Sequence, residues 1–147
     1  MEFAYNTEQL GENGTFGRKS HKEILLVQYF QNALRTLNPW ITDTQVDEAQ
    51  KKFEHHMSIS SLMQINEEKY SMIREGIPVT VKKANGQMEE KKAMVIDFEH
   101  PFDEERNHFL AIKELKIHGD LYRRRTDIVG FVNGIPLLFV ELKKNTV

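Results

Sequence analysis

Three charged residues near the carboxyl end of the chain have types and spacing that could do chemistry together. Asp127 stands near the start of an almost entirely apolar stretch, and Glu141 and Lys143 stand near its end. Burying a charge costs several kcal/mol unless the charge is paired or bound to a metal. Two explanations follow: a divalent-metal site for phosphodiester hydrolysis, or an internal salt bridge at the end of a strand.

The metal explanation assigns a separate task to each group. Asp127 and Glu141 offer the hard oxygen ligands that Mg²⁺ prefers, and Mg²⁺ keeps several waters and can bind a phosphate oxygen. A bound Mg²⁺ would stabilise the charge that develops on the phosphate and lower the pKa of a bound water. Lys143 would stabilise the pentacovalent state or orient the attacking water. The backbone carbonyl of Leu142 could be a further ligand.

A basic run precedes these residues. Arg123, Arg124 and Arg125 could hold flanking phosphates without reading base sequence, because phosphate contacts position a protein on DNA and base contacts specify it. The alternative for each arginine is a solvated charge on the surface. The run therefore favours DNA binding only if the metal site exists.

The elements that must position these residues form a β-hairpin. Two β-branched and aromatic runs meet at Asn133-Gly134, which is the strongest short-range hairpin signal. Side chains alternate along a strand, so Glu141 and Lys143 share a face. The nearly continuous apolar character predicts that both faces of this hairpin are covered and that it is central in its sheet.

The metal explanation makes a demand on the register of this hairpin. A regular two-residue turn would pair Asp127 with Val140, and Asp127 and Glu141 would then face opposite sides. A three-residue loop or a β-bulge shifts the count by one and brings the two carboxylates together. Gly130 and Pro136 are the positions where a bulge or a ladder break is easiest.

The rest of the chain predicts helices first and strands afterwards, which is an α+β fold. Residues 1–19 are polar and glycine-punctuated and are expected to be a flexible arm, followed by one domain over 20–147. Apolar periodicity and capping boxes predict helices from Ser20 to Asn38, from Thr42 to about His56, and from Ser61 to Glu75. Period-two segments predict strands over 77–83, 88–98 and 109–117, the first two joined at Asn85-Gly86.

Two other groups of polar residues are weaker candidates for a metal site. His55 and His56 are adjacent in sequence, which puts them on different faces of a helix, so we interpret them as solvated residues at a helix end. The acidic connection from Asp97 to Glu105 favours a solvated loop, with a metal site as a minor alternative.

Composition narrows the class of protein. The net charge of −2 gives no global attraction to nucleic acid, so any such role must come from a local patch. The absence of cysteine excludes disulfides and thiolate metal sites. No apolar run approaches a membrane span and no signal pattern opens the chain, so the expectation is a cytoplasmic protein that does not enter membranes.

The hairpin and its surroundings resemble a known family. The runs Asn107-His108-Phe109-Leu110-Ala111-Ile112, Arg124-Arg125-Thr126-Asp127-Ile128-Val129-Gly130-Phe131-Val132-Asn133-Gly134-Ile135-Pro136-Leu137 and Val140-Glu141-Leu142-Lys143 resemble the N-terminal domain of the R subunit of type I restriction enzymes. Weaker similarity lies in Leu34-Arg35-Thr36-Leu37-Asn38-Pro39-Trp40 and in Val95-Ile96-Asp97-Phe98.

The resemblance implies a restriction-endonuclease-like domain of the PD-(D/E)xK type. It implies that Asp127, Glu141 and Lys143 are the catalytic set, that Mg²⁺ is the cofactor and that double-stranded DNA is the substrate. It also implies an ATP-driven translocase elsewhere in the full subunit and a complex with methylation and specificity subunits that cleaves unmethylated foreign DNA.

The sequence departs from the family pattern at several points. Thr126 replaces a proline that the family usually has before the aspartate. The usual first helix, which often brings an extra glutamate, is not recognisable in residues 1–19, and Glu23 is a candidate substitute. A helix with a Q-x-x-x-Y element and a Walker-type ATPase motif are also missing. We therefore expect a truncated nuclease domain that is inactive alone.

Two other functions stay open on the sequence alone. One is a PD-(D/E)xK nuclease from another DNA-processing system, which would use the same three residues. The other is a docking or assembly module without catalysis, in which Asp127, Glu141 and Lys143 are paired for structure.

Overall fold

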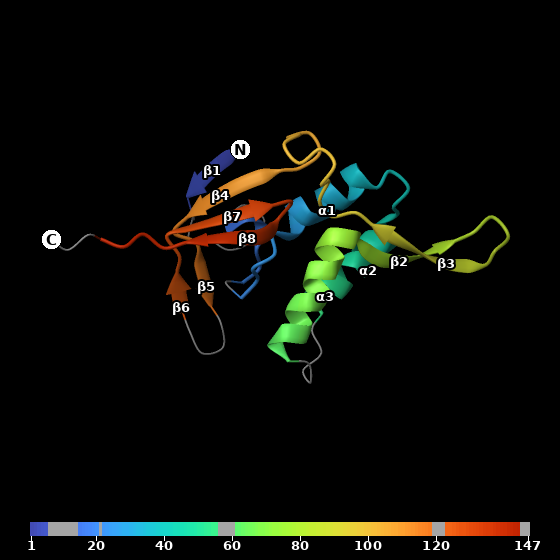
Figure 1. Ribbon diagram of the computed structural model, residues 1–147, viewed down its shortest axis with the longest axis horizontal. Helices are drawn as coiled ribbons and strands as arrows, with labels where there is room; N and C mark the ends of the chain where they lie inside the picture. Colours follow the sequence, from blue (N-terminus) through green and yellow to red (C-terminus); the bar gives the residue numbers. More distant parts are fainter. Residues whose placement is uncertain (6–14, 21, 56–60, 119–122, 145–147) are drawn as a thin grey trace. The chain divides into compact units, whose positions relative to one another are not determined.

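A computed structural model of the chain describes residues 1–5, 15–20, 22–55, 61–118 and 123–144. It divides into two compact units: unit 1 is Met1–Tyr29 with Asn107–Val147, and unit 2 is Phe30–Arg106. Helices and sheets occupy separate stretches of the chain, so the predicted α+β class is confirmed (Figure 1).

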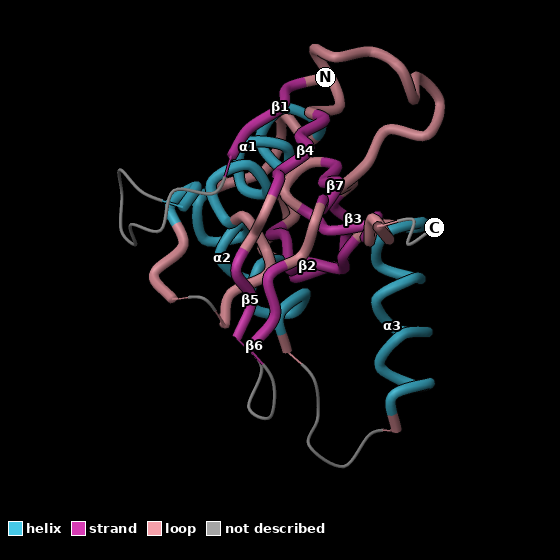
Figure 2. Tube along the Cα trace, turned by 90° about the vertical axis from the view of Figure 1, so that its left-hand side faces the viewer, coloured by secondary structure: helices cyan, strands magenta, loops and turns pink. Residues whose placement is uncertain are grey.

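Unit 1 is built on a mixed four-stranded sheet in the order β1-β4-β7-β8. β1 runs parallel to β4, and the other neighbours are antiparallel. Figure 2 shows β1, β4 and β7 side by side. The strands of this sheet are β1 (Glu2–Tyr5), β4 (Phe109–Lys113), β7 (Ile128–Val132) and β8 (Ile135–Val140). The prediction of a central hairpin with both faces covered is wrong for its second strand: β8 lies at the edge of the described sheet, and its Leu138 and Phe139 are more than half exposed. A two-stranded ribbon of β5 (Lys116–His118) and β6 (Arg123–Arg125) accompanies it.

The amino-terminal segment differs from the predicted flexible arm in part. Residues 2–5 form β1, which pairs with β4 in the register Glu2 to Leu110. A short 3-10 turn follows at Thr15–Gly17. The intervening residues 6–14 lie outside the described part of the chain.

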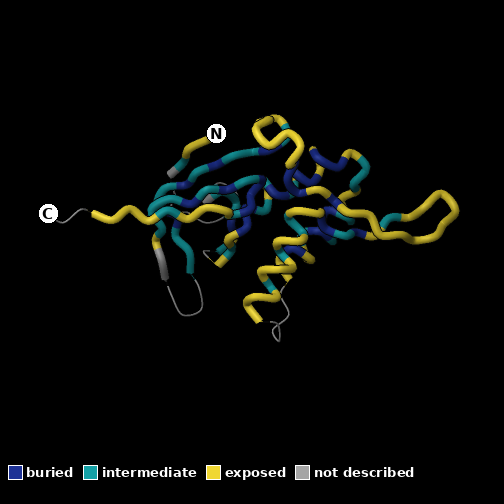
Figure 3. The backbone as a smooth tube through the Cα atoms, in the orientation of Figure 1, coloured by how far each residue is buried: buried dark blue, intermediate teal, exposed yellow. Residues whose placement is uncertain are grey.

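One face of this sheet carries the core of unit 1. Leu110 and Ile112 of β4 alternate with half-buried residues, and Val129 and Phe131 lie directly opposite them on β7. Alternate residues of paired strands share a face, so these four side chains form one apolar layer. Leu26 and Leu115 complete the buried cluster. Figure 3 colours the backbone by burial, with buried stretches dark blue and exposed ones yellow.

The first helix begins later than its apolar pattern predicts. α1 spans Val27–Leu37, seven residues past Ser20. The Ser20 hydroxyl accepts the backbone N–H of Lys22 at 3.2 Å in a local turn and does not cap the helix. Leu26 is fully buried and its N–H donates to the carbonyl of Gly134 at 2.9 Å. The residues just before α1 are therefore held by the sheet, and the predicted start at Ser20 is wrong. The end before Pro39 is confirmed.

The other two helices follow their caps. α2 spans Asp43–Glu54 behind a capping box of Thr42 and Gln45, and α3 spans Leu62–Glu75 behind one of Ser61 and Gln64. α3 has no buried residue among its members. Gly76 ends it with φ 96°, a conformation that glycine adopts without strain.

The hairpin of unit 2 is shorter on one side than predicted. β2 (Ile77–Lys82) pairs with β3 (Met88–Ala93), and the chain turns at Asn85-Gly86. β3 ends at Ala93 and not at Phe98, because the next residue is bound elsewhere. The Met94 N–H donates to Oδ1 of the buried Asn38 at 2.8 Å, and the Met94 carbonyl accepts from Nδ2 of Asn38 at 2.8 Å.

Side chains of α2 form hydrogen bonds with backbone groups along the edge of β2 that does not face β3. Glu48 accepts the Thr80 N–H at 3.1 Å, and Gln45 donates to the Thr80 carbonyl at 3.1 Å. Lys52 donates to the Pro78 carbonyl at 2.6 Å. The backbone groups that an edge strand would otherwise offer to another chain are therefore occupied along this stretch.

Candidate active site

The register of the β7–β8 hairpin meets the demand that a joint carboxylate site makes. Val132 pairs with Ile135 and Phe131 with Pro136 across the two-residue turn, but Gly130 then pairs with Leu138. The ladder skips Leu137, which is a β-bulge at the position next to Gly130 and Pro136. This break shifts the pairing so that Ile128 faces Val140. The paired residues end there, since β8 stops at Val140; continued by one step, the same register would set Asp127 against Glu141.

Asp127 contacts the end of the second strand directly. Its Oδ2 accepts the backbone N–H of Leu142 at 2.5 Å. Its own backbone carbonyl accepts the N–H of Glu114 at 2.9 Å. Asp127 is half-buried, whereas Glu141, Leu142 and Lys143 are exposed. The aspartate is therefore fixed from both sides beside a short exposed segment that carries the other two predicted residues.

The donor set at this place fits a hard cation. Asp127 and Glu141 each lie one residue beyond the last pair of the ladder, Ile128 with Val140, and the N–H of Leu142 donates to Asp127. Within the described residues no group of three or more His, Cys, Asp or Glu side chains gathers to hold a metal. Mg²⁺ does not need one, since it is commonly bound through one or two carboxylates and keeps several waters.

The three arginines before Asp127 form strand β6. Arg125 is exposed and its Nη1 lies 3.8 Å from Oε2 of Glu114. Both side chains are largely in solvent, where such a pair contributes little to stability. The ribbon is joined to the hairpin by Thr126, whose N–H and hydroxyl both donate to the Leu115 carbonyl, at 3.1 and 3.2 Å. The threonine that replaces the usual proline thus supplies two hydrogen bonds.

Glu23, the candidate extra carboxylate, is engaged in the turn before α1. Its Oε2 accepts the Lys19 N–H at 2.8 Å. Its carbonyl accepts from Nη1 of Arg18 at 3.1 Å, and the same guanidinium nitrogen donates to the Lys116 carbonyl at 3.0 Å. Burial lowers the pKa of Arg18, with the charge of Glu23 acting in the opposite direction. These contacts give Glu23 a structural task, and its metal role stays a prediction.

Asn133 and Gly134 do more than turn the chain. Asn133 has φ 51° and Gly134 φ 78°, which are the left-handed values that a type I′ turn requires. The buried Asn133 accepts the His108 N–H at 2.7 Å and donates to Asn107 Oδ1 at 3.1 Å. Its N–H donates to the His108 carbonyl at 2.9 Å. The sequence predicted the turn. It did not predict that the Asn133 side chain binds the backbone of His108, just before β4.

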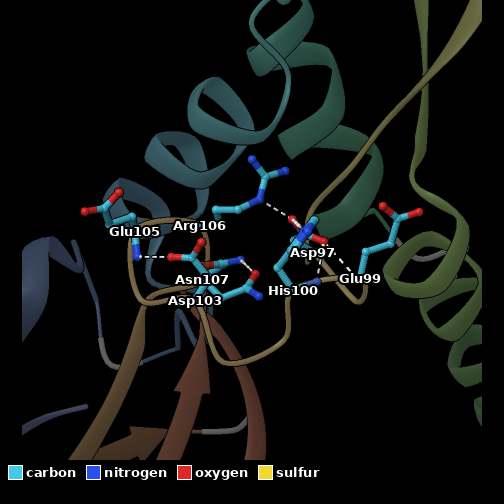
Figure 4. A network of polar contacts seen from close by, with 8 residues as sticks. Asp97, Glu99, His100, Asp103, Glu105, Arg106 and Asn107 are labelled. Carbon is cyan, nitrogen blue, oxygen red and sulfur yellow. Dashed lines mark hydrogen bonds and ion pairs between the residues drawn. The ribbon is translucent and has the colours of Figure 1, made fainter.

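The acidic connection is partly the solvated loop that the sequence favoured. Residues 98–105 are exposed, but Asp97 is 2% exposed and forms the centre of a polar network (Figure 4). Its carboxylate accepts from Nε of Arg106 and from the N–H groups of Glu99 and His100, the last two at 2.9 and 3.1 Å. The bond from Arg106 holds the pKa of Asp97 well below its usual range, although desolvation acts against it. Asp97 therefore stabilises the loop that runs from Glu99 to Arg106.

Other features of the structure do not add to the site. An open groove of about 870 Å³ is lined by α2, α3 and the residues that follow α3, and it contains none of the predicted catalytic residues. His55 lines this groove and caps α2, and His56 lies outside the described residues. Among the described helices, none is long and apolar enough to cross a membrane.

Comparison with known proteins shows that the chain is similar to endonuclease subunits of type I restriction enzymes. It is 32% identical over 143 residues to the type I restriction enzyme HindI endonuclease subunit of Haemophilus influenzae, which covers 97% of this chain and 13% of that protein. It is 27% identical over 129 residues to the putative type I restriction enzyme MjaIXP endonuclease subunit of Methanocaldococcus jannaschii, covering 86% of this chain and 12% of that protein. No solved structure gives a significant match.

The family profile described as type I restriction enzyme R protein N terminus matches residues 2–147, which is nearly the whole chain. Both relatives are many times longer than the chain, so the match concerns one part of such a subunit. The sheet, the bulged hairpin and the three predicted residues at its end all lie within the matched range. The chain belongs to the family of type I restriction enzyme R protein N-terminal domains.

Proposed function

We propose that this chain is the DNA endonuclease domain of a type I restriction enzyme R subunit and hydrolyses phosphodiester bonds with Mg²⁺. The observation that carries the proposal is the register of the β7–β8 hairpin. A regular hairpin would separate Asp127 from Glu141, whereas the bulge at Leu137 shifts the pairing to Ile128 with Val140, a register that supports a common face for the two carboxylates one step beyond the ladder. A salt bridge at a strand end would not by itself require two acids on one face.

The chain's own residues take defined tasks in this proposal. Asp127 and Glu141 would hold the metal, together with the backbone carbonyl of Leu142. Bound there, Mg²⁺ would supply a positive charge for the phosphate and a water of lowered pKa. Lys143, two residues after Glu141 in the exposed segment that follows β8, would place an ammonium at the reacting phosphate and stabilise its added negative charge. Cations of the arginine run that precedes Asp127 would hold the flanking phosphates.

The wider setting belongs to the same proposal. In the full subunit, ATP-driven translocation would bring DNA to this domain, in a cytoplasmic complex with methylation and specificity subunits. The names of both relatives as endonuclease subunits support this setting. The chain alone holds no ATPase motif, so we expect it to cleave poorly or not at all by itself.

Metal binding can be tested on the chain without cleavage. At a free metal concentration ten times the dissociation constant, Mg²⁺ or Mn²⁺ should stabilise the fold by about 1.4 kcal/mol, or roughly 4 °C in melting temperature. Asp127→Ala should abolish this shift. Glu99→Gln is the matched control, because it removes an exposed carboxylate outside the site and should keep the shift. A shift that survives Asp127→Ala would refute the proposed metal site.

Catalysis needs the full-length protein. There, Lys143→Ala should abolish DNA cleavage and leave ATP hydrolysis intact. Equal loss of both activities would count against the role assigned to Lys143.

A further inference from the structure

The register of the β5–β6 ribbon separates the three arginines. Lys116 pairs with Arg125, Ile117 with Arg124, and His118 with Arg123. Residues that pair directly share a face of the sheet, and neighbours along a strand alternate between faces. The register therefore places Lys116, His118, Arg123 and Arg125 on one face, which we call the basic face. Arg124 falls at a position of the opposite face, with Ile117.

The two faces differ in what surrounds them. Ile117 packs against the buried cluster of unit 1, so its face of the ribbon is the one toward the core. The basic face is thus the one away from that cluster by register. None of the six paired residues is acidic.

The basic face breaks an ordinary rule of sheet composition. Like charges directly opposite each other on paired strands destabilise a sheet, and here Lys116 stands opposite Arg125. The Glu114 carboxylate, 3.8 Å from Arg125 and largely in solvent, offsets this repulsion only in small part. A local cost of this kind is typical of a functional surface. Cations repeated on one face fit a ligand with regularly spaced negative charges.

The ribbon is also tied to the candidate active site. The N–H of Glu114 donates to the carbonyl of Asp127 at 2.9 Å, and Thr126 binds the Leu115 carbonyl through two donors. Arg125 lies two residues before Asp127, or about 6.6 Å along a strand, and Arg123 lies about 13 Å before it. A polyanion lying along the basic face would therefore run toward Asp127.

We propose that the basic face of the β5–β6 ribbon binds the phosphate backbone of duplex DNA and directs it toward Asp127. This inference rests on the proposed function and adds Lys116 and His118 to the DNA contacts, while it removes Arg124 from them. Duplex DNA is favoured over single strands because none of the six paired residues is Phe, Tyr or Trp, the rings on which unpaired bases stack.

The test measures the salt dependence of binding by the 147-residue chain. Fluorescence anisotropy of a labelled duplex is followed against NaCl in EDTA, so that no metal contributes. Each lost phosphate contact lowers the slope of log K against log salt by about 0.9, which corresponds to about eightfold in affinity at about 0.1 M salt. Lys116→Gln with Arg125→Gln should therefore lower the slope by about 1.8. Lys116→Arg should keep it.

Arg124→Gln is the matched control, since it removes the same charge from the same strand at the other face. It should leave the slope unchanged, with circular dichroism confirming that each variant folds. An equal fall for Arg124→Gln and Arg125→Gln would overturn the assignment of faces. Absence of duplex binding, or tighter binding of single strands, would overturn the DNA assignment.

The measurement separates this inference from the proposed function. Asp127→Ala should remove the metal-dependent stabilisation but leave the slope in EDTA unchanged. A normal slope pattern without metal stabilisation would retain the DNA surface and reject the metal site. Metal stabilisation without the slope pattern would retain the metal site and reject the DNA surface.

Discussion

Replacing Asn133 by alanine should destabilise unit 1 through two separable effects. Asn133 is 1% exposed, and its side chain accepts from the His108 N–H and donates to Asn107 Oδ1. Losing a buried hydrogen-bond partner costs about 1–3 kcal/mol for each group affected. Alanine must also adopt the positive φ of 51°, which costs about 1 kcal/mol or more outside glycine and asparagine.

The expected loss for Asn133→Ala is therefore about 3–7 kcal/mol in the free energy of unfolding. Asn133→Gly removes the same side-chain hydrogen bonds but accepts the positive φ without strain, so its loss should be about 2–6 kcal/mol. The backbone hydrogen bond from residue 133 to the His108 carbonyl remains possible in both variants.

Urea unfolding followed by circular dichroism measures these losses. The difference between the alanine and glycine variants isolates the backbone effect, and the glycine variant alone reports the side chain. If Asn133→Gly were as stable as the natural chain, the hydrogen bonds to Asn107 and His108 would contribute nothing. If the two variants were equally destabilised, the left-handed conformation at residue 133 would carry no cost.

Three further predictions concern unit 2. Asn38→Ala removes the two bonds to Met94 and should cost about 2–4 kcal/mol in urea unfolding, whereas a loss under 1 kcal/mol would contradict the role of Asn38 as a buried bridge. Gly76→Ala should cost about 2 kcal/mol or more, because φ is 96° and the new Cβ would lie 2.9 Å from the Ala93 carbonyl oxygen; a thermal melt would show this. Asp97→Asn should destabilise the fold at neutral pH. The pKa of Asp97 is lowered in the folded state, so its contribution is present above about pH 4 and is lost as pH falls below that value. Melting curves of the two proteins should therefore converge in acid, and a constant difference would refute the charge-based explanation.

Local signals in the sequence predicted local structure well. The capping boxes at Thr42 and Ser61 and the turns at Asn85 and Asn133 are all present, because each depends on a few adjacent residues. The demand for a register break between Asp127 and Glu141 was also predictable, since it follows from counting side chains along two strands.

Contacts between distant parts of the chain were not predictable in the same way. The start of α1 is set by the bond from Leu26 to Gly134, more than a hundred residues away. β1 is held by parallel pairing to β4, for which the four-residue segment Glu2–Tyr5 is too short to give a signal. Asp97 looked like its solvated acidic neighbours, and it differs from them by its burial and by its bond to Arg106. The metal and DNA roles of the site remain predictions.

The bulge at Leu137 has a consequence for how the length of this hairpin can vary. The Asn133-Gly134 turn lies at one end of the β7–β8 ladder, and Asp127 and Glu141 lie just beyond the other end. Because the ladder skips Leu137, the pairing at the second end is shifted by one residue relative to the pairing next to the turn. Deleting Leu137 would leave a continuous ladder in which Asp127 still faces Glu141. Deleting one residue between Leu138 and Glu141 would, with the bulge kept, move Glu141 to the other face. Homologous hairpins should therefore differ in length at the bulge, and insertions or deletions between the bulge and Glu141 should come in pairs.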